Sequence, residues 1–413
     1  MYLYHNTEND LVINVEHIHF RQQLIQTFKQ RFSTYGYHEI VTPTFEAYDL
    51  YAGMNGTVNK NEMIKTIDNN GEVLVLRPDI TIPITQLIAN SNNKIHEDLR
   101  YFYIENVFRQ RQEAVNYRES TQAGVEHFGN PNAQADAEII ALAIHLLQDM
   151  NLQHFKIEFG HAGFFKQLVK DMELSHDDLH ALQQSIQAKN ITDIKDILSS
   201  LLVDEDTKKI VTSLPFLYGE TEQVLEKTMS LPLHPALKET LKDIRRIYDV
   251  LQAYGVTDHI VIDLSLINHM DYYSDMIFQG FIEKVGKPVV MGGRYNTLAN
   301  QFNASIPAIG FAFNIDTLID GIDRTSDANT PTIDVVLLYD DDVEERALML
   351  AKNLRLEQFQ VITYPNTSNK QQVPKATHIL NVSNSNISLK LDDETIEGLS
   401  ESAVMMQLKD WRA

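Results

Sequence analysis

A carboxylate and a hydroxyl lie close together in the segment Leu76–Thr81 and could bind a small charged ligand. Asp79 supplies the carboxylate, and Thr81 supplies the hydroxyl two positions later. A buried ammonium group loses much of its hydration, so a pocket that binds one needs a carboxylate and neutral acceptors. Asp79 and Thr81 together meet that requirement. The same pair also suits an ordinary turn, which is the alternative interpretation.

Arg109 and the segment around Glu126 form a second group of polar residues. Gln122, Gly124 and Glu126 occupy alternate positions, so on a β-strand all of them would face the same side. An amide, a carboxylate and a guanidinium offer donors and acceptors to a polar ligand. The alternation therefore predicts one wall of a binding pocket.

Tyr272 and Tyr273 are adjacent aromatic residues that could contact a flat ligand. A tyrosine combines an apolar ring with a hydroxyl, so it can pack against another ring and form a hydrogen bond as well. Buried tyrosines are also common in protein cores, and Tyr272 could serve packing alone. The pair belongs either to a ligand site or to the core.

Metal and thiol chemistry are not expected. The chain has no cysteine, which excludes disulfides, thiolate metal sites and cysteine nucleophiles. His176 and His180 are four positions apart in a predicted helix, a spacing that could hold a metal ion. Histidine and aspartate on a solvated helix face are the commoner arrangement. We therefore predict no metal site and no cofactor.

The balance of charge weighs against nucleic acid as a partner. The chain has 35 Lys and Arg residues against 57 Asp and Glu residues, which gives a formal charge of -22. Such a field repels polyanions unless a local basic surface opposes it. The sequence shows no basic leader before an apolar segment, and no run near the roughly 20 apolar residues that span a bilayer. We predict a cytoplasmic protein that binds neither nucleic acid nor membrane.

A mixed set of helices and strands must position these residues. Apolar residues recur at every fourth position over 20–32, which predicts an amphipathic helix that ends near Gly36. Strand patterns follow at 73–76 and 101–108, and a helical pattern covers 135–150. The N-terminal half is therefore predicted to combine α and β structure.

The C-terminal half is predicted to contain an insertion, a linker and a further domain. Alternating apolar residues at 155–159 and 260–264 predict strands on either side of a helical insertion at about 162–254. A polar, turn-rich segment at 320–331 predicts a linker. Residues 331–413 alternate between strand and helix patterns, so we predict a small α/β domain there.

Several segments resemble, in the same order along the chain, the motifs of class II histidyl-tRNA synthetases. Phe32–Glu46 resembles motif 1, which forms the dimer interface in that family, and Leu76–Thr81 resembles its Arg-Pro-Glu-Gly-Thr element. Phe108–Gly129 resembles motif 2. Asn268–Tyr273 resembles the histidine-specific Arg-Gly-Leu-Asp-Tyr-Tyr signature, and Gly310–Leu318 resembles motif 3. The shared order makes an accidental match implausible.

The resemblance covers most of residues 1–325, excluding the helical insertion, and implies the fold. We expect an α+β fold: a class II aminoacyl-tRNA synthetase-like antiparallel sheet flanked by helices, with the helical insertion and a small C-terminal α/β domain. That domain is shorter than the anticodon-binding domain of the family and only loosely similar to it, so RNA binding is not carried over. One more segment, Gly292–Asn296, matches the Gly-Gly-Arg-Tyr-Asp turn of the family.

The resemblance also implies a site for histidine. In the family, a carboxylate and a hydroxyl hold the α-amino group of histidine. An arginine, a glutamine and a glutamate contact its carboxylate, amino group and imidazole, and a tyrosine packs on the imidazole. The matching residues of this chain, with the neighbouring tyrosine, are Asp79, Thr81, Arg109, Gln122, Glu126, Tyr272 and Tyr273. We therefore expect these side chains to line one pocket.

Residues that the family uses to activate histidine with ATP are not kept. Thr317 stands where motif 3 has the arginine that grips ATP, and Asn314 replaces a glycine of that motif. Asn268 replaces the arginine of the histidine-specific signature. Activation of an amino acid brings two anions together and needs cations, and losing one preorganised donor costs about 10²- to 10³-fold in rate. We expect no catalytic residue and no aminoacylation.

This combination resembles the non-catalytic regulatory subunits of ATP phosphoribosyltransferase more closely than the synthetases. The form Arg118-Glu119-x-x-Gln122 is also more typical of those subunits. The resemblance implies histidine sensing, allosteric feedback on histidine biosynthesis and, as partner, the short-form catalytic subunit, with a homodimer of this chain in a hetero-octamer. The alternatives are a divergent histidyl-tRNA synthetase and a synthetase-like protein for another small molecule. Histidine could bind in the ancestral pocket or at a subunit interface.

Overall fold

The structure is a computed structural model of the chain. It describes residues 15–54, 58–91, 98–110, 118–170, 172, 174–267, 272–322, 333–366, 373–374, 376–391 and 394–412. The chain divides into two units: the first comprises residues 1–4 and 21–323, and the second comprises residues 5–20 and 324–413. Within the described ranges, no helix has the length and apolar character needed to cross a membrane.

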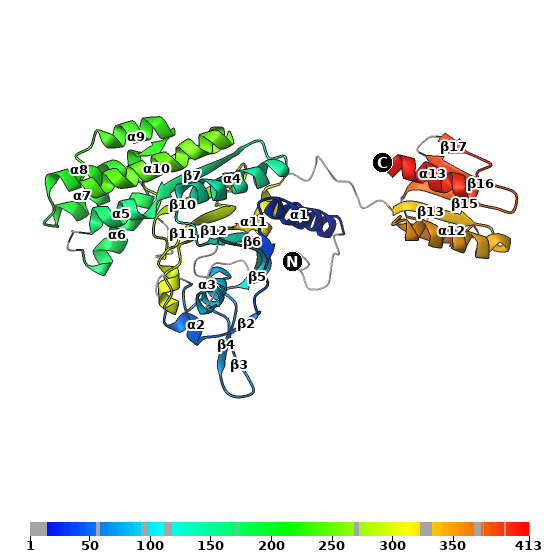
Figure 1. The fold of residues 1–413 in the computed structure, drawn as a ribbon, viewed down its shortest axis with the longest axis horizontal. Helices are drawn as coiled ribbons and strands as arrows, with labels where there is room; N and C mark the ends of the chain where they lie inside the picture. Colours follow the sequence, from blue (N-terminus) through cyan, green and yellow to red (C-terminus); the bar gives the residue numbers. More distant parts are fainter. Residues whose placement is uncertain are drawn as a thin grey trace. The chain divides into compact units, whose positions relative to one another are not determined.

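A large mixed sheet, the central sheet, forms the middle of the first unit (Figure 1). Its strands, in spatial order, are β1 (His38–Glu39), β5 (Leu99–Phe108), β6 (Glu119–Phe128), β12 (Ala308–Asn314), β11 (Val290–Arg294), β10 (Met276–Ile282), β7 (Phe155–His161), β9 (Ile260–Asp263) and β8 (Tyr218–Gly219). From β5 to β7 all neighbours are antiparallel, whereas β1 with β5 and β7 with β9 are parallel. The predicted α+β class, with a mainly antiparallel sheet flanked by helices, is confirmed.

Helix α1 (Val15–Thr34) packs on one face of the central sheet through its apolar stripe. Phe28 and Phe32 are completely buried, and the ring of Phe28 meets that of Phe313 on β12 edge-on at 5.1 Å. Burying each such side chain contributes about 1.5–3 kcal/mol. The chain turns at Gly36, as predicted, where φ is +78° and a residue with a side chain would be strained.

Helix α4 (Ala133–Asp149) covers the same face of the sheet as α1. Arg294 on β11 reaches Asp136 in the first turn of α4 through a buried ion pair of 2.7 Å. Glu126 on β6 pairs with Gly310 on β12 and faces the other side of the sheet. That second face is therefore free of α1 and α4 and can carry a site.

Helices α5 to α10 form an insertion between β7 and β9. They are α5 (Ala162–Val169), α6 (His176–Gln187), α7 (Ile191–Ser199), α8 (Glu205–Ser213), α9 (Thr221–Met229) and α10 (Pro235–Tyr254), and in Figure 1 they gather at one end of the unit. The side chains of Ser175, Asn190 and Asp204 cap α6, α7 and α8 by accepting hydrogen bonds from backbone amides. The short strand β8 also lies within this stretch and pairs with β9. The sequence pattern does not predict β8, because a strand of two residues has no alternation to detect.

A small sheet and two helices carry the residues between β1 and β5. These elements are β2 (Phe45–Ala47), α2 (Asp49–Ala52), β3 (Lys65–Ile67), β4 (Val73–Leu76) and α3 (Thr81–Asn90). The hairpin of β3 and β4 extends away from the central sheet (Figure 1). Strand β4 leads almost directly into α3, so Asp79 and Thr81 lie at the start of that helix. Helix α11 (Ile315–Gly321) and the 3₁₀ helices η1 (Leu214–Phe216), η2 (Thr257–His259) and η3 (Leu298–Phe302) also belong to the described part of this unit.

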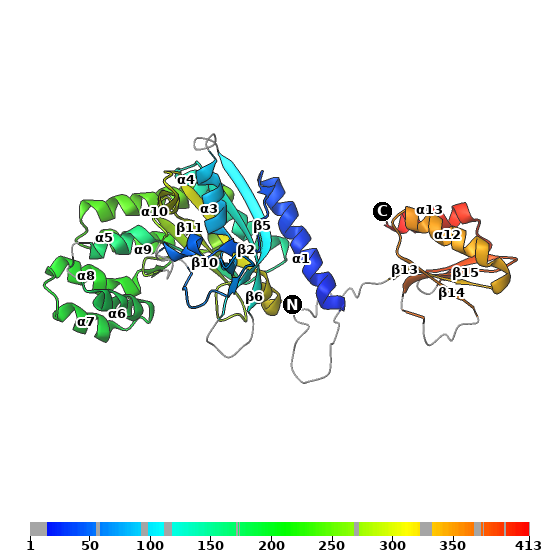
Figure 2. The ribbon, with the colours of Figure 1, turned by 90° about the horizontal axis from the view of Figure 1, so that it is seen from below.

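The second unit is a sheet with two helices on one face (Figure 2). The strands, in spatial order, are β14 (Val361–Pro365), β13 (Ile333–Tyr339), β15 (Ala376–Val382), β16 (Ile387–Leu391) and β17 (Glu394–Ile396), and the helices are η4 (Asp341–Val343), α12 (Glu344–Leu356) and α13 (Glu401–Arg412). β13 runs parallel to both β14 and β15, so β13, α12 and β14 form a βαβ connection. The α/β character predicted for this region is confirmed.

Candidate ligand-binding site

A cavity of about 270 Å³ lies on the face of the central sheet that carries Glu126. Its lining residues are Asp79, Thr81, Tyr103, Arg109, Gln122, Glu126, Tyr272, Tyr273, Lys287, Pro288, Val289, Val290, Met291, Tyr295, Gly310, Phe311, Ala312, Asn314 and Thr317. Every residue of the histidine site predicted from the sequence is in this set. Residues far apart in the chain therefore converge on one cavity.

Glycines make room for the polar groups on the floor of the cavity. Gln122, Gly124 and Glu126 follow one another at alternate positions of β6, and Glu126 lies opposite Gly310 of β12. A Cβ atom at Gly310 would overlap the Glu126 carboxylate. A Cβ atom at Gly124 would meet the hydroxyl of Tyr103. The space that the Glu126 carboxylate occupies thus depends on a glycine in the neighbouring strand.

Glu126 is a buried carboxyl group with hydroxyl partners. Thr81 Oγ1 donates a hydrogen bond of 2.6 Å to Glu126 Oε1, and the hydroxyl of Tyr295 donates to Oε2. Burial raises the pKa of Glu126 to about 8, although the two hydroxyl donors oppose that shift. The group is therefore largely neutral at neutral pH, and a cationic ligand beside it would favour its ionised form.

Asp79 and Arg109 form a charged pair at the start of α3. Asp79 Oδ1 accepts a hydrogen bond of 2.9 Å from the amide of Ile82, and Asp79 Oδ2 lies 3.9 Å from Arg109 Nη2. Burial raises the pKa of Asp79, and Arg109 lowers it. Arg109 Nε also donates a hydrogen bond of 2.8 Å to the carbonyl of Pro78. Asp79 therefore closes the first turn of α3 with one oxygen, while its other oxygen faces the Arg109 guanidinium.

Aromatic rings pack together along another part of the cavity. The rings of Tyr272 and Tyr273 are 4.7 Å apart, and Tyr272 meets Tyr295 edge-on at 5.8 Å. Burial raises the pKa of each of these phenols. They therefore stay protonated at neutral pH, so each hydroxyl can donate a hydrogen bond as well as accept one. Tyr272 serves packing and cavity lining together.

Sequence reasoning missed three of the polar lining residues: Tyr103, Lys287 and Tyr295. Tyr295 belongs to the segment Gly292–Asn296, whose resemblance to a family turn was the available signal. Its role as a donor to Glu126 depends on the alignment of β11, β12 and β6, which are distant in sequence. Tyr103 lies opposite Gly124 across the β5–β6 pair, and no sequence pattern indicates that partnership.

Asn314 and Thr317, at the positions that resemble motif 3, have structural roles in α11. Asn314 Oδ1 caps α11 by accepting a hydrogen bond of 2.9 Å from the amide of Thr317. Thr317 is buried, with 4% of its surface exposed. Among the described lining residues, the cationic side chains are those of Arg109 and Lys287. Asn268, the other replaced arginine position, lies outside the described residues.

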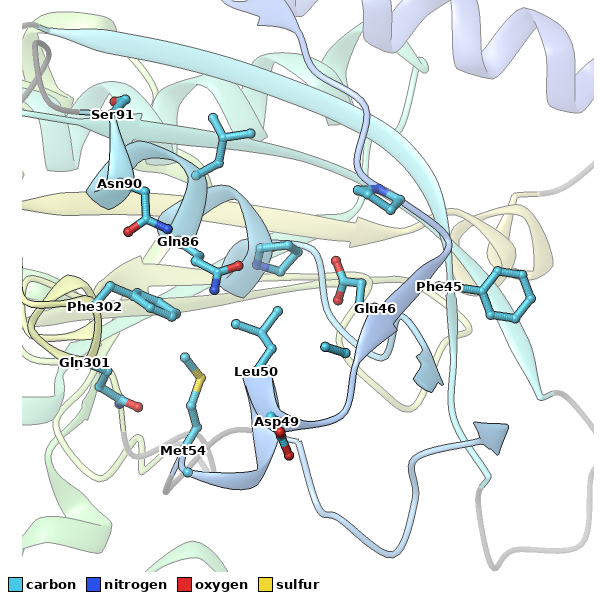
Figure 3. A pocket seen from close by; sticks show the side chains of 15 residues that line it. Phe45, Glu46, Asp49, Leu50, Met54, Gln86, Asn90, Ser91, Gln301 and Phe302 are labelled. Atoms are coloured by element: carbon cyan, nitrogen blue, oxygen red, sulfur yellow. The ribbon is translucent and has the colours of Figure 1, made fainter. Parts of the chain in front are cut away.

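A larger groove of about 1260 Å³ lies near the segment that resembles motif 1. It is formed by residues of β2, α2, α3 and η3. Figure 3 shows Leu50, Met54 and Phe302 directed into a common space, whereas the ring of Phe45 points away from it. Phe45 is 55% exposed and the lining residue Leu87 is 54% exposed. Exposed apolar side chains therefore lie both in the lining of the groove, at Leu87, and beside it, at the ring of Phe45.

Nothing in the described residues suggests a metal site. His176 is the first residue of α6, and its side chain is almost fully exposed. Across the described ranges, His, Asp and Glu side chains form no cluster suited to a metal ion. The spacing of His176 and His180 therefore belongs to an exposed helix start.

The chain is similar to known proteins over most of its length. The family model described as histidyl-tRNA synthetase matches residues 13–318. An ATP phosphoribosyltransferase regulatory subunit of Oceanobacillus iheyensis is 38% identical over 373 residues, which cover 90% of this chain and 91% of that protein. A regulatory subunit of the same name from Clostridium acetobutylicum is 37% identical over 293 residues, with coverage of 70% and 71%.

Solved structures share the fold. A Bacillus halodurans protein described as an ATP phosphoribosyltransferase regulatory subunit/histidyl-tRNA synthetase superposes with a TM-score of 0.76 at 27% identity, covering 89% of this chain and 93% of that one. Histidyl-tRNA synthetase from Nostoc superposes with a TM-score of 0.78 at 19% identity, covering 96% of both chains. The second likeness concerns the fold alone.

Proposed function

The chain belongs to the family of ATP phosphoribosyltransferase regulatory subunits, and from this premise we propose that it senses free histidine through the cavity on the central sheet. It is a non-catalytic subunit of that enzyme, which acts in histidine biosynthesis. The observation that carries the histidine proposal is the convergence of Asp79, Arg109 and Glu126 on one small cavity. Position 317, at the same cavity, holds a threonine instead of a cation.

The cavity matches free histidine in size and in chemistry. Its volume of about 270 Å³ lies just below the range of roughly 300–1,000 Å³ typical for drug-sized ligands, which favours a single amino acid. Asp79 and Gln122 offer acceptors for the α-amino group, and Arg109 offers a cation for the carboxylate. Glu126 and Tyr273 offer a carboxyl and a phenol for the imidazole. This complementary set of charges supports the assignment.

The partner in this proposal is the short-form catalytic subunit of ATP phosphoribosyltransferase. The chain forms a homodimer within a cytoplasmic hetero-octamer and binds no nucleic acid. Histidine reduces the activity of the assembled enzyme by allosteric feedback, because it binds one state of the complex more tightly than the other. The catalytic residues lie on the partner chain.

Reconstitution with the purified short-form catalytic subunit tests the proposal. The two chains should co-purify, and phosphoribosyl transfer to ATP should appear only in the mixture. Histidine should inhibit that activity, and calorimetry should detect histidine binding to this chain alone. A catalytic subunit whose activity and histidine response are the same with and without this chain would refute the proposal.

A further inference from the structure

Two side chains of the helical insertion hold the segment that carries Tyr273. Lys166 Nζ, on α5, donates a hydrogen bond of 2.7 Å to the carbonyl of Tyr273. Gln187 Nε2, at the end of α6, donates one of 2.5 Å to the carbonyl of Ile267. Both acceptors lie in the connection between β9 and β10, on either side of residues 268–271. The insertion therefore contacts this connection at both of its described ends.

Helix α5 also packs closely against the residues after Tyr273. The amide of Ala162, its first residue, donates a hydrogen bond of 2.7 Å to the carbonyl of Asp275. A Cβ atom at Gly163 would lie 3.3 Å from the carbonyl oxygen of Ser274. The backbone from Tyr273 to Asp275 is thus held along the first turns of α5, and a shift of that helix would move this backbone.

The opposite side of the same segment faces the cavity. The amide of Ser274 donates a hydrogen bond of 2.8 Å to the carbonyl of Arg294 on β11. A Cβ atom at Gly293 would lie 2.9 Å from Cδ1 of Tyr273, so the ring rests directly on the β11 backbone. Tyr273 is therefore placed between the rigid sheet and the insertion, and its ring lines the cavity.

We propose that Lys166 and Gln187 are positioning residues for the histidine site and couple the helical insertion to ligand binding. This inference rests on the proposed histidine-sensing function. Neither residue lines the cavity. Lys166 holds the backbone carbonyl of Tyr273 itself, and Gln187 holds the carbonyl of Ile267 in the same connection between β9 and β10. Because coupling is reciprocal, an insertion that biases Tyr273 is itself biased when histidine binds. The insertion thereby becomes the element that carries the binding signal away from the cavity.

The hydrogen bond from the Lys166 ammonium to Tyr273 is expected to be stronger than the one from the Gln187 amide to Ile267. A hydrogen bond with a charged donor contributes more than one between neutral groups, but partial exposure to water reduces its effect. We expect Lys166→Met to weaken histidine binding about 3- to 10-fold, a loss in the range of one net hydrogen bond. Gln187→Met should weaken it by about 2- to 5-fold for the same reason.

Calorimetric titration of the full chain with histidine tests this inference. The variants are Lys166→Met, Lys166→Arg and Gln187→Met, with Lys195→Met on α7 as the matched control. Lys166→Arg keeps a charged donor and should restore most of the affinity, whereas Lys195→Met should bind like the parent. Melting temperatures should stay close to that of the parent, because Lys166 and Gln187 are exposed. Amide hydrogen exchange at residues 272–275 should rise in Lys166→Met.

The outcomes separate this inference from the function on which it rests. A parent chain that does not bind histidine removes the proposed function, and the inference with it. A parent that binds histidine, with Lys166→Met and Gln187→Met both as tight as Lys195→Met, overturns the positioning role alone. Loss of affinity at unchanged melting temperature, restored by Lys166→Arg, supports the role and rules out a general loss of stability.

Discussion

Thr81 Oγ1 donates a hydrogen bond of 2.6 Å to Glu126 Oε1 and so joins the first residue of α3 to the floor of the cavity. The hydroxyl of Tyr295 reaches the other oxygen of the same carboxyl group. A group in this position has fixed geometry, because both oxygens are engaged by the chain itself. Its protonation state then responds both to burial and to any ligand beside it.

Loss of the Glu126 carboxyl group, which a cationic ligand would ionise, or of the Tyr273 hydroxyl should weaken histidine binding. We expect Glu126→Gln and Tyr273→Phe each to lower affinity by about 5- to 150-fold, the equivalent of about 1–3 kcal/mol. Each substitution nearly conserves volume, so the chain should remain folded. Calorimetry measures the affinity, and the control is Tyr218→Phe, which lies on the edge strand β8 and outside the cavity lining. Folded variants with parental affinity would place the histidine site elsewhere, with a subunit interface as the first alternative to test.

The stability of the chain should fall with rising pH because of Glu126. Its pKa is raised from 4.5 to about 8 by burial. Between about pH 4.5 and 8, the folded form therefore holds a proton that the unfolded chain has already released. Its contribution is fully present below about pH 4.5 and is lost by about pH 8, at a rate of at most about 1.4 kcal/mol per pH unit. Denaturant unfolding of Glu126→Gln should show a smaller decline over this window, and equal slopes would contradict the assignment.

The glycine at position 310 should be indispensable for ligand binding. A Cβ atom there would overlap the Glu126 carboxylate and the Val125 carbonyl. Gly310→Ala should therefore abolish histidine binding and destabilise the fold by about 1–3 kcal/mol. Gly286→Ala adds the same methyl group where nothing lies within 4 Å, and it should leave both properties unchanged. Calorimetry and thermal melting compare the two, and histidine binding by Gly310→Ala would rule out this arrangement of the cavity.

A homodimer should form through the motif 1 region, as predicted from Phe32–Glu46. Val41 is 74% exposed and Phe45 55% exposed, and uncovered apolar side chains of this kind mark interaction surfaces. Phe45→Glu should weaken self-association by about 30-fold or more, the effect of losing about 2 kcal/mol at an interface. Leu202→Glu changes a fully exposed leucine of the insertion and is the control. Analytical ultracentrifugation decides, and a monomeric parent at micromolar concentration would exclude the dimer.

The chain should not activate histidine. Histidine-dependent exchange of pyrophosphate into ATP needs cations at the reacting phosphate, and losing one costs about 10²- to 10³-fold in rate. Thr317→Arg should not restore exchange, because position 317 is 4% exposed and its amide is held by Asn314. We expect this variant to lose stability instead, as overpacked cores do. Exchange above background in the parent would favour a divergent synthetase.

Local patterns in the sequence predict individual helices and strands well. Apolar residues at every fourth position up to Phe32, followed by the glycine at position 36, predict α1 and its end, because helix periodicity and a positive φ are properties of short segments. The alternation of Gln122 and Glu126 correctly predicts that both face one side of β6.

Contacts between distant segments could not be predicted in this way. The bond from Tyr295 to Glu126 depends on the register of β11, β12 and β6, which only the folded sheet fixes. The hydrogen bond that the amide of Ile82 donates to Asp79 is local. The sequence predicts a ligand contact for that carboxylate, with an ordinary turn as the alternative, and does not indicate that it closes the first turn of α3. The hydrogen bond between Lys166 and Tyr273 joins residues 107 positions apart, and no pattern in the sequence indicates it.

The engagement of both Glu126 oxygens by Thr81 and Tyr295 bears on the concentration range in which a sensor operates. A ligand that approaches this carboxyl group must share or replace these existing hydrogen bonds. Binding is therefore favoured only by the difference in free energy between the new hydrogen bonds and those that they replace. A smaller net gain raises the dissociation constant and shortens the residence time. If the cavity senses histidine as proposed, the two hydroxyls help to define the half-saturation point, which would keep the sensor responsive when the metabolite pool rises and falls.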